Sequence, residues 1–175
     1  VYRVQVTSPY GSATSNDALL SVGTVPGITA HPADVIATVG TTAAFNVVAT
    51  GTAPLSYQWQ KDNVDLNGAT SSTLTLTNVQ LADNSTYRVK VSNAYGSVTS
   101  NGATLRVGLA PAITTQPVAT IATIGGSATF SVVATGTAPL TYQWQKKAAN
   151  STYNNIAGAT ASTLTRANAQ LADSG

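Results

Sequence analysis

Cysteine and methionine are both absent from this 175-residue sequence, and the only histidine is His31. Without cysteine, neither a disulfide nor a thiolate metal site can form. A zinc site needs about four ligands, which one histidine cannot supply. The sequence therefore predicts no metal and no cofactor, and each folded unit must be stabilised by packing alone.

Charge is also scarce. Charged residues make up 8% of the chain, glutamate is missing, and the net charge is +2. Ordinary soluble domains carry about 25% charged residues. The basic residues are scattered and form no stripe beside aromatic side chains, which argues against a nucleic-acid partner. No apolar run approaches the ~20 residues of a membrane-spanning helix, so we expect no membrane insertion in this segment.

Patterns that support catalysis are missing too. His31 precedes Pro32 on an expected edge strand, and no nucleophile-elbow motif accompanies it. The nearest pair of carboxylates, Asp62 and Asp65, falls in an expected hairpin turn, where aspartate favours turn formation. A weak calcium site at this pair is an alternative, although the spacing is not that of an EF-hand. We predict that the chain is not an enzyme and has no catalytic or metal-binding residues.

What the sequence does contain is a long internal repeat. Residues 44–60, AFNVVATGTAPLSYQWQ, return at 129–145 as TFSVVATGTAPLTYQWQ, 85 positions later. Residues 2–16 return at 87–101 with the same offset. Residues 68–76 return at 158–166, 90 positions later, so the second copy has five extra residues between Trp144 and Gly158. A repeat of this length indicates tandem copies of one folded unit.

The phase of the repeat predicts three pieces. We expect residues 1–23 to be the last two strands of a preceding domain, 26–108 to be a complete domain, and 111–175 to be a domain that lacks its last two strands. The linkers, Val22–Pro26 and Val107–Pro111, are short and contain proline, which stiffens the chain. We therefore expect a semi-rigid rod. The missing strands belong either to a continuous polypeptide or to a neighbouring subunit.

Alternation with period two marks the strands. In 45–49 the apolar side chains alternate with polar or exposed positions, and in 57–60 Tyr57 and Trp59 alternate with glutamines. Turn-forming residues separate these runs every 8–12 positions, as in a β-sandwich. The sequence predicts an all-β fold.

The resemblance to a known family is carried by a few spaced residues. Trp59 follows Val47 by 12 positions, and the segment 83–89, DNSTYRV, resembles the Asp-x-Gly/Ala-x-Tyr-x-Cys signature of immunoglobulin domains. The chain thus resembles an immunoglobulin-like β-sandwich, specifically the cysteine-free, I-set-type tandem repeats of large bacterial extracellular surface proteins. The resemblance places Val47 and Val89 where the family has its two cysteines. It also implies that the Tyr87 hydroxyl bonds the backbone and that Asp83 fixes the turn before its strand.

The remaining copies supply the same core positions. In the second copy these are Val132, Trp144 and Asp173, and in the first piece they are Tyr2 and Val4. One position departs from the pattern, because Arg166 stands where the first copy has Leu76. Arg166 could pair with Asp173, mark a looser edge, or reflect an error in the sequence, and the residues alone leave these alternatives open.

Two surface features are candidates for modification or binding. Asn84 and Asn150 begin N-glycosylation sequons, both in expected loops. The insertion lengthens the loop 146–157, and Lys147, Tyr153 and Asn154 near it could contact a sugar or a protein. A longer hairpin without any special role is the alternative.

Together these features predict a structural role. We expect a repeat unit of an extracellular stalk, filament or surface adhesin at the cell surface, whose partners are copies of itself end to end. The alternative is an adhesion module that binds carbohydrate or protein through the inserted loop 146–157. A spacer attached to an enzyme elsewhere in the same polypeptide is a third hypothesis.

Overall fold

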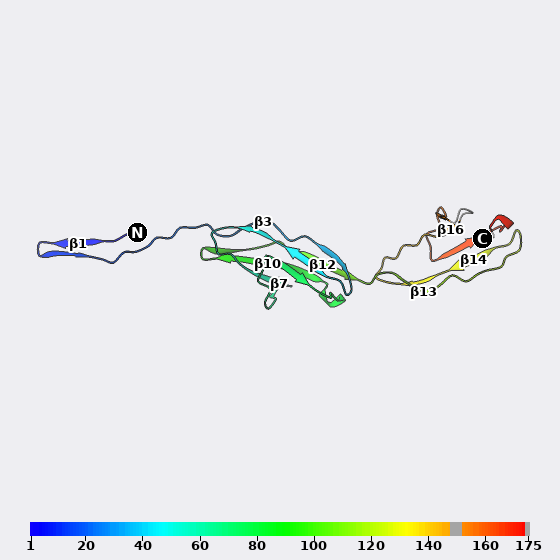
Figure 1. The fold of residues 1–175 in the computed structure, drawn as a ribbon, viewed down its shortest axis with the longest axis horizontal. Helices are drawn as coiled ribbons and strands as arrows, with labels where there is room; N and C mark the ends of the chain where they lie inside the picture. Colours follow the sequence, from blue (N-terminus) through cyan, green and yellow to red (C-terminus); the bar gives the residue numbers. More distant parts are fainter. Residues whose placement is uncertain (148–151, 174–175) are drawn as a thin grey trace.

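The computed structural model describes residues 1–147 and 152–173, and it has three successive groups of β-strands along one long axis (Figure 1). The N-terminal hairpin comes first, followed by a central unit (residues 27–108) and a third unit (residues 112–173). The hairpin and the third unit lie at opposite ends of the molecule, with the central unit between them.

The N-terminal hairpin (residues 2–18) is an isolated antiparallel pair. Its strands are β1 (Gln5–Ser8) and β2 (Gly11–Thr14), and a bridge between Tyr2 and Ala18 extends the pairing. All of its residues are exposed, so both faces of the hairpin lack a packing partner in this structure.

The first layer of the central unit is a sheet in the order β4-β12-β10-β7-β8, with β11 also paired to β10. All its pairings are antiparallel except β12–β4, which is parallel. The strands are β4 (Val35–Thr38), β7 (Ser56–Lys61), β8 (Val64–Asp65), β10 (Ser85–Asn93), β11 (Gly96–Thr99) and β12 (Ala103–Gly108).

The second layer consists of the pairs β3–β6 and β5–β9. Its strands are β3 (Gly27–Ala30), β5 (Ala43–Asn46), β6 (Val48–Thr50) and β9 (Thr73–Leu76). β5 and β6 follow one another on either side of Val47, whose amide nitrogen donates to the Ser72 carbonyl at 3.0 Å. The short 3₁₀ helix η1 (Leu81–Asp83) leads into β10.

Alternating side chains from both layers form the core of the central unit. Ala43, Phe45 and Val47 are buried, whereas the intervening Ala44 and Asn46 are exposed. The other core residues are Trp59, Leu74, Val79, Tyr87, Val89, Val91, Ala103, Leu105 and Val107. Two packed sheets with this pattern are the arrangement that period-two alternation predicts.

The third unit repeats only part of this sandwich. Its pairs are β13–β15, β14–β18 and β16–β17. The elements are β13 (Ala112–Thr115), β14 (Ala128–Ser131), β15 (Val133–Thr135), β16 (Gln145–Lys147), β17 (Tyr153–Asn155), β18 (Thr163–Arg166) and the 3₁₀ helix η2 (Leu171–Asp173). Residues 141–144 correspond to the start of β7 but have no strand pairing, since no equivalent of β10 lies beside them within the described residues.

The predicted all-β fold class is confirmed: the central unit is a two-layer β-sandwich, and the third unit repeats part of it. Among residues 1–147 and 152–173, no helix has the length and apolar character needed to cross a membrane.

Candidate functional site

Trp59 lies at the centre of the central sandwich. The residue is completely buried, and its indole nitrogen donates to the Ser71 carbonyl at 2.8 Å, so burial leaves its one polar group satisfied. Phe45 packs against it with ring centroids 6.2 Å apart. Val47 and Val89, at the two positions where the resembled family has cysteine, are both buried in the same core. Apolar packing thus occupies the centre of a sandwich that has no crosslink.

Tyr87 connects the core to the turn before its strand. Its ring stacks on Phe45 at a centroid distance of 5.1 Å, and its hydroxyl donates to the Asp83 carbonyl at 2.9 Å. The Asp83 carboxylate accepts from the Gln80 amide nitrogen at 2.8 Å and lies 3.7 Å from the Lys61 ammonium. Burial, with smaller contributions from the Asp83 and Asp62 charges, raises the pKa of Tyr87 to about 12.

The third unit reproduces these contacts around Trp144. Its indole nitrogen donates to the Ala161 carbonyl at 2.9 Å, and Phe130 lies 6.3 Å from it, centroid to centroid. Unlike Trp59, Trp144 is only half-buried. Val132, which corresponds to Val47, is half-buried as well. The shared sequence therefore forms the same local geometry although the strands that correspond to β4, β10 and β12 are absent from the described residues.

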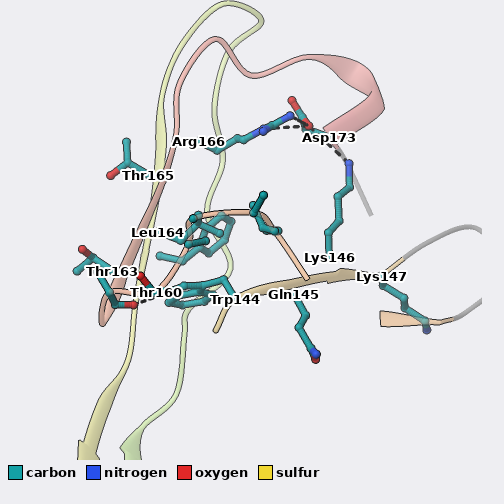
Figure 2. Close-up of a pocket in the computed structure, with 16 residues that line it drawn as sticks. Trp144, Gln145, Lys146, Lys147, Thr160, Thr163, Leu164, Thr165, Arg166 and Asp173 are labelled. Carbon is teal, nitrogen blue, oxygen red and sulfur yellow. Dashed lines mark hydrogen bonds and ion pairs between the residues drawn. The ribbon is translucent and has the colours of Figure 1, made fainter. Parts of the chain in front are cut away.

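Arg166 pairs with Asp173 and extends away from the apolar surface (Figure 2). Its guanidinium donates to one Asp173 oxygen at 2.9 Å and 3.1 Å, and the Lys146 ammonium lies 3.5 Å from the same oxygen. The Arg166 hydrogen bonds and the Gln170 amide lower the pKa of Asp173 below its usual value. Of the alternatives that the sequence left open for Arg166, the ion pair is the one found.

Two hollows of the third unit, both lined by Trp144, form what we call the open groove. One, of about 610 Å³, is lined by residues that include Phe130, Arg166 and Asp173. The other, of about 700 Å³, is lined by residues that include Ile113, Val132 and Leu140. Trp144 lines both, so the two hollows share one apolar wall.

The junction before the central unit is held by side chains of two loops. The Thr24 amide nitrogen donates to the Thr52 hydroxyl at 2.8 Å, and the Thr52 amide returns a bond to the Thr24 carbonyl at 3.2 Å. The side-chain amide of Asn93 donates to the backbone carbonyls of both Thr24 and Thr52 at 2.8 Å. Gly23 lies beneath the Tyr95 ring so closely that a Cβ there would be 2.3 Å from a ring carbon. A larger residue at this place would therefore require the Tyr95 ring to move.

The junction after the central unit repeats this pattern. Leu109 and Thr137 exchange two hydrogen bonds, from the Leu109 amide to the hydroxyl at 2.6 Å and from the Thr137 amide to the Leu109 carbonyl at 3.0 Å. The preceding carbonyl, that of Gly108, accepts from the Val39 amide at 2.9 Å. Gly108 is thus hydrogen-bonded to the central unit, and the next residue, Leu109, is hydrogen-bonded to the third unit.

The inserted loop is a longer hairpin in its described part. Lys147 pairs with Tyr153 and Lys146 with Asn154 across β16 and β17, whereas the central unit turns between Lys61 and Val64. Tyr153, Asn154 and Lys147 are all exposed, so the three residues suggested for binding lie together on one hairpin.

Of the two sequon asparagines, only Asn84 lies within the described residues. The side-chain amide of Asn84 donates to the Leu81 carbonyl at 2.9 Å and the Val107 carbonyl at 3.1 Å, and its oxygen accepts from the Val107 amide. A glycan on this nitrogen would replace one of those hydrogens. Asn150 lies outside the described residues. Glycosylation at either position stays a prediction.

The residues that were candidates for catalysis or metal binding make hydrogen bonds within the fold. The His31 Nδ1 atom accepts from the Asn101 amide at 3.0 Å. Asp65 accepts from the Gln60 side chain at 2.7 Å, and Asp62 lies at the turn with a positive φ of 49°. Within the part of the chain that the structure describes, no three His, Cys, Asp or Glu side chains are grouped so as to hold a metal ion.

The sequence did not predict the hydrogen bonds that the Thr52 and Thr137 hydroxyls make at the two junctions, or those that Asn84 makes with Leu81 and Val107. Thr52 and Thr137 lie within the repeated TGTAPL segment, so their 85-residue spacing was visible, but nothing in the sequence marked their partners at 24 and 109.

Comparison with known families supports the fold. A family model described as "Immunoglobulin domain" matches residues 25–93, which is most of the central unit.

Two curated proteins have similar sequences. Endoglucanase C of Cellulomonas fimi is 32% identical over 148 residues, which cover 82% of this chain and 13% of that protein. Human leucine-rich repeats and immunoglobulin-like domains protein 1 is 28% identical over 155 residues, covering 83% of this chain and 14% of that protein. The chain thus spans only a small part of the length of these relatives.

Solved structures of tandem immunoglobulin domains resemble the whole arrangement. The I-band fragment I67–I69 from titin has a TM-score of 0.67 at 23% identity, covering 86% of this chain and 58% of that one. Extracellular domains 3–5 of Drosophila OTK have a TM-score of 0.65 at 21% identity, covering 98% and 62%. At this identity the likeness concerns the fold. The chain therefore has an immunoglobulin-like fold in tandem units, and its residues 25–93 match the immunoglobulin domain family.

Proposed function

We propose that this chain is a non-catalytic segment of an extracellular stalk, filament or surface adhesin, in which successive sandwiches form a semi-rigid rod. The observation that carries the proposal is the junction: Gly108 is bonded to the central unit and Leu109 to the third unit. No free residue separates the two attachments, so bending at this place requires breaking hydrogen bonds.

The equivalence of the two junctions adds support. Thr24 and Thr52 make the same reciprocal bonds as Leu109 and Thr137, with both partners displaced by 85 residues. A contact that recurs with the sequence repeat would give each unit the same orientation relative to the one before it. An array with this property extends in a regular direction, which suits reach and mechanical continuity.

Spin labels can test the rod directly, because the chain has no native cysteine. Thr75→Cys and Thr165→Cys place labels at equivalent exposed positions on β9 and β18. Double electron–electron resonance on labelled chain diluted in unlabelled chain should give one narrow distance distribution. Thr137→Val, which removes the junction hydroxyl, should broaden it, whereas Thr160→Val in a turn of the same unit should not. A broad distribution in the parent chain would reject the rod.

The location at the cell surface, in an array like those of large bacterial surface proteins, belongs to the same proposal. It is supported by the bacterial origin of the Cellulomonas fimi relative and by the extracellular domains of Drosophila OTK, which share the tandem fold. Antibodies raised against residues 26–108 should label intact, unpermeabilised source cells. Labelling that requires permeabilisation would contradict an extracellular position.

A second candidate function is adhesion through the hairpin β16–β17. The observation that favours it is the exposure of Tyr153, 63%, directly across from Lys147 on the neighbouring strand. A tyrosine ring beside a cation offers stacking and hydrogen bonding to a sugar or a protein. Glycan-array and cell-attachment assays should lose signal with Tyr153→Ala, but keep it with Val64→Ala on the central hairpin. Equal signals for the two variants would rule out this site.

A further inference from the structure

The strand β9 of the central unit is paired along only one of its edges. It runs antiparallel to β5, and within residues 1–147 and 152–173 no strand is paired to its other edge. The segment that precedes it, residues 66–71, lies beside this edge without pairing, and a hollow of about 390 Å³ is lined by both the segment and β9. The second layer of the sandwich thus ends in a strand whose backbone is open to pairing.

The register shows which backbone groups are open. The Val47 amide nitrogen donates to the Ser72 carbonyl at 3.0 Å, so these two residues form a hydrogen-bonded pair beside the β5–β9 ladder. Hydrogen-bonded and non-hydrogen-bonded pairs alternate along an antiparallel ladder. The backbone of Leu74 is therefore bonded to β5, whereas the N–H and C=O groups of Thr73 and Thr75 point to the free edge.

The sequence of this edge has no protection against pairing. Edge strands of natural sheets usually carry charged side chains or proline, or are covered. Residues 66–82 contain no charged residue and no proline, and threonine alternates with leucine along β9. The equivalent strand of the third unit, β18, has Arg166 in the place of Leu76. The unprotected edge is therefore a feature of the central unit.

The strand is complementary to a second copy of itself. Thr73 and Thr75 are exposed on the outer face, whereas Leu74 is buried in the core. Antiparallel pairing that sets Thr73 of one copy opposite Thr75 of the other keeps threonines on one face and leucines on the other. Each of these threonine pairs would exchange both of its backbone hydrogen bonds, because their open groups point to the shared edge.

We propose that β9 of one copy pairs antiparallel with β9 of a second copy across a two-fold axis, which joins two second layers into one continuous sheet. The contact uses the same edge on both copies, so it closes as a dimer and does not extend as a filament. A pair of four-residue strands buries less area than a standard interface, so the association is weak and reversible. The proposal concerns this edge alone and does not rest on the rod function.

Sedimentation velocity of the purified chain tests the association. Between about 10 µM and 1 mM, a species of twice the chain mass of 17.7 kDa should grow with concentration. Thr75→Pro removes an N–H at the free edge without removing a bond to β5, and it should abolish this species. Ala44→Lys, directly across from Thr75 on β5 and one strand away from the edge, should leave it intact. A monomer throughout this range, or loss of the dimer in Ala44→Lys, would overturn the proposal.

A second edge variant keeps the test decisive if the proline chain misfolds. Thr75→Lys retains every backbone group but makes the two lysines diagonal neighbours across the paired edges, so it should raise the dissociation constant at least tenfold. Urea denaturation followed by tryptophan fluorescence shows whether each variant is folded. Equal dissociation constants for Thr75→Lys and Ala44→Lys would contradict pairing through this edge.

Disulfide trapping locates the contact. Residues in a hydrogen-bonded antiparallel pair have Cα atoms about 5.5 Å apart, which a disulfide can span. Mild oxidation of tagged Thr73→Cys chain mixed with untagged Thr75→Cys chain should therefore yield a reducible heterodimer. Asn46→Cys, which lies across from Thr73 on β5, should give at least tenfold less when mixed with Thr75→Cys. Equal yields from both mixtures would show that the contact is not the one proposed.

Discussion

The Tyr87 hydroxyl donates a hydrogen bond to the carbonyl of Asp83, four residues earlier, at 2.9 Å. The bond joins the buried end of β10 to the 3₁₀ helix η1, whose own N-terminus is capped by the Asp83 carboxylate. It therefore fixes the place where the chain enters the central strand of the sheet.

Removing this hydroxyl should destabilise the central unit. Tyr87→Phe keeps the ring stacked on Phe45 but leaves the Asp83 carbonyl without its partner, at a cost of about 1 to 2 kcal/mol in the free energy of unfolding. Urea denaturation followed by tryptophan fluorescence measures it. Tyr10→Phe, at a fully exposed turn, is the matched control and should change nothing. An unchanged midpoint for Tyr87→Phe would contradict the role assigned to this bond.

Stability should also fall at alkaline pH. The pKa of Tyr87 is raised from 10.0 to about 12 in the folded state, so the fold favours the protonated hydroxyl. The contribution is complete below pH 10 and is lost as pH rises through about 12. The unfolding midpoint of the parent chain should decline across this window more than that of Tyr87→Phe, which has no group to titrate there. Parallel curves for the two proteins would show that Tyr87 is not the cause.

Asn84 should matter for stability whether or not it is glycosylated. Its side chain bonds Leu81 and both backbone groups of Val107, and so ties η1 to β12. Asn84→Ala should lower the free energy of unfolding by about 1 to 3 kcal/mol, because backbone groups beside the core lose their partners. Ser97→Ala on the exposed strand β11 serves as the control. A loss no larger than that of the control would refute this assignment.

A disulfide should be tolerated at the positions of Val47 and Val89. Val47→Cys with Val89→Cys should form a disulfide on oxidation and raise stability by about 2 to 4 kcal/mol, reversibly with reductant. Val48→Cys with Val89→Cys should not, since Val48 is exposed and Val89 is buried. Free thiols persisting in the first pair under oxidation would mean that the two valines do not face each other as in the resembled family.

Much of the fold could be predicted because it depends on local alternation. Phe45, Val47 and Trp59 lie on the buried side of strands whose polar residues alternate with them, and that pattern is visible in the sequence. The parallel pairing of β4 with β12 was not predicted. It joins residues about 70 positions apart, and nothing in either segment marks its partner.

The side-chain hydrogen bonds of the junctions and of Asn84 could not be predicted for a similar reason. Threonine and asparagine are so frequent in this chain that Thr52, Thr137 and Asn84 look like ordinary loop residues. Their roles arise only once the fold brings a backbone amide or carbonyl within 3.2 Å. The pairing of Arg166 with Asp173 could be listed among alternatives, but only the geometry of η2 selected it.

The orientation of successive units tests the central claim most directly. Residual dipolar couplings of backbone amides can be measured for the central and third units of the chain. The account predicts that both sets of couplings fit one alignment tensor, because Gly108 and Leu109 hold the two units together as one body. Separate tensors of clearly different magnitude for the two units would contradict it.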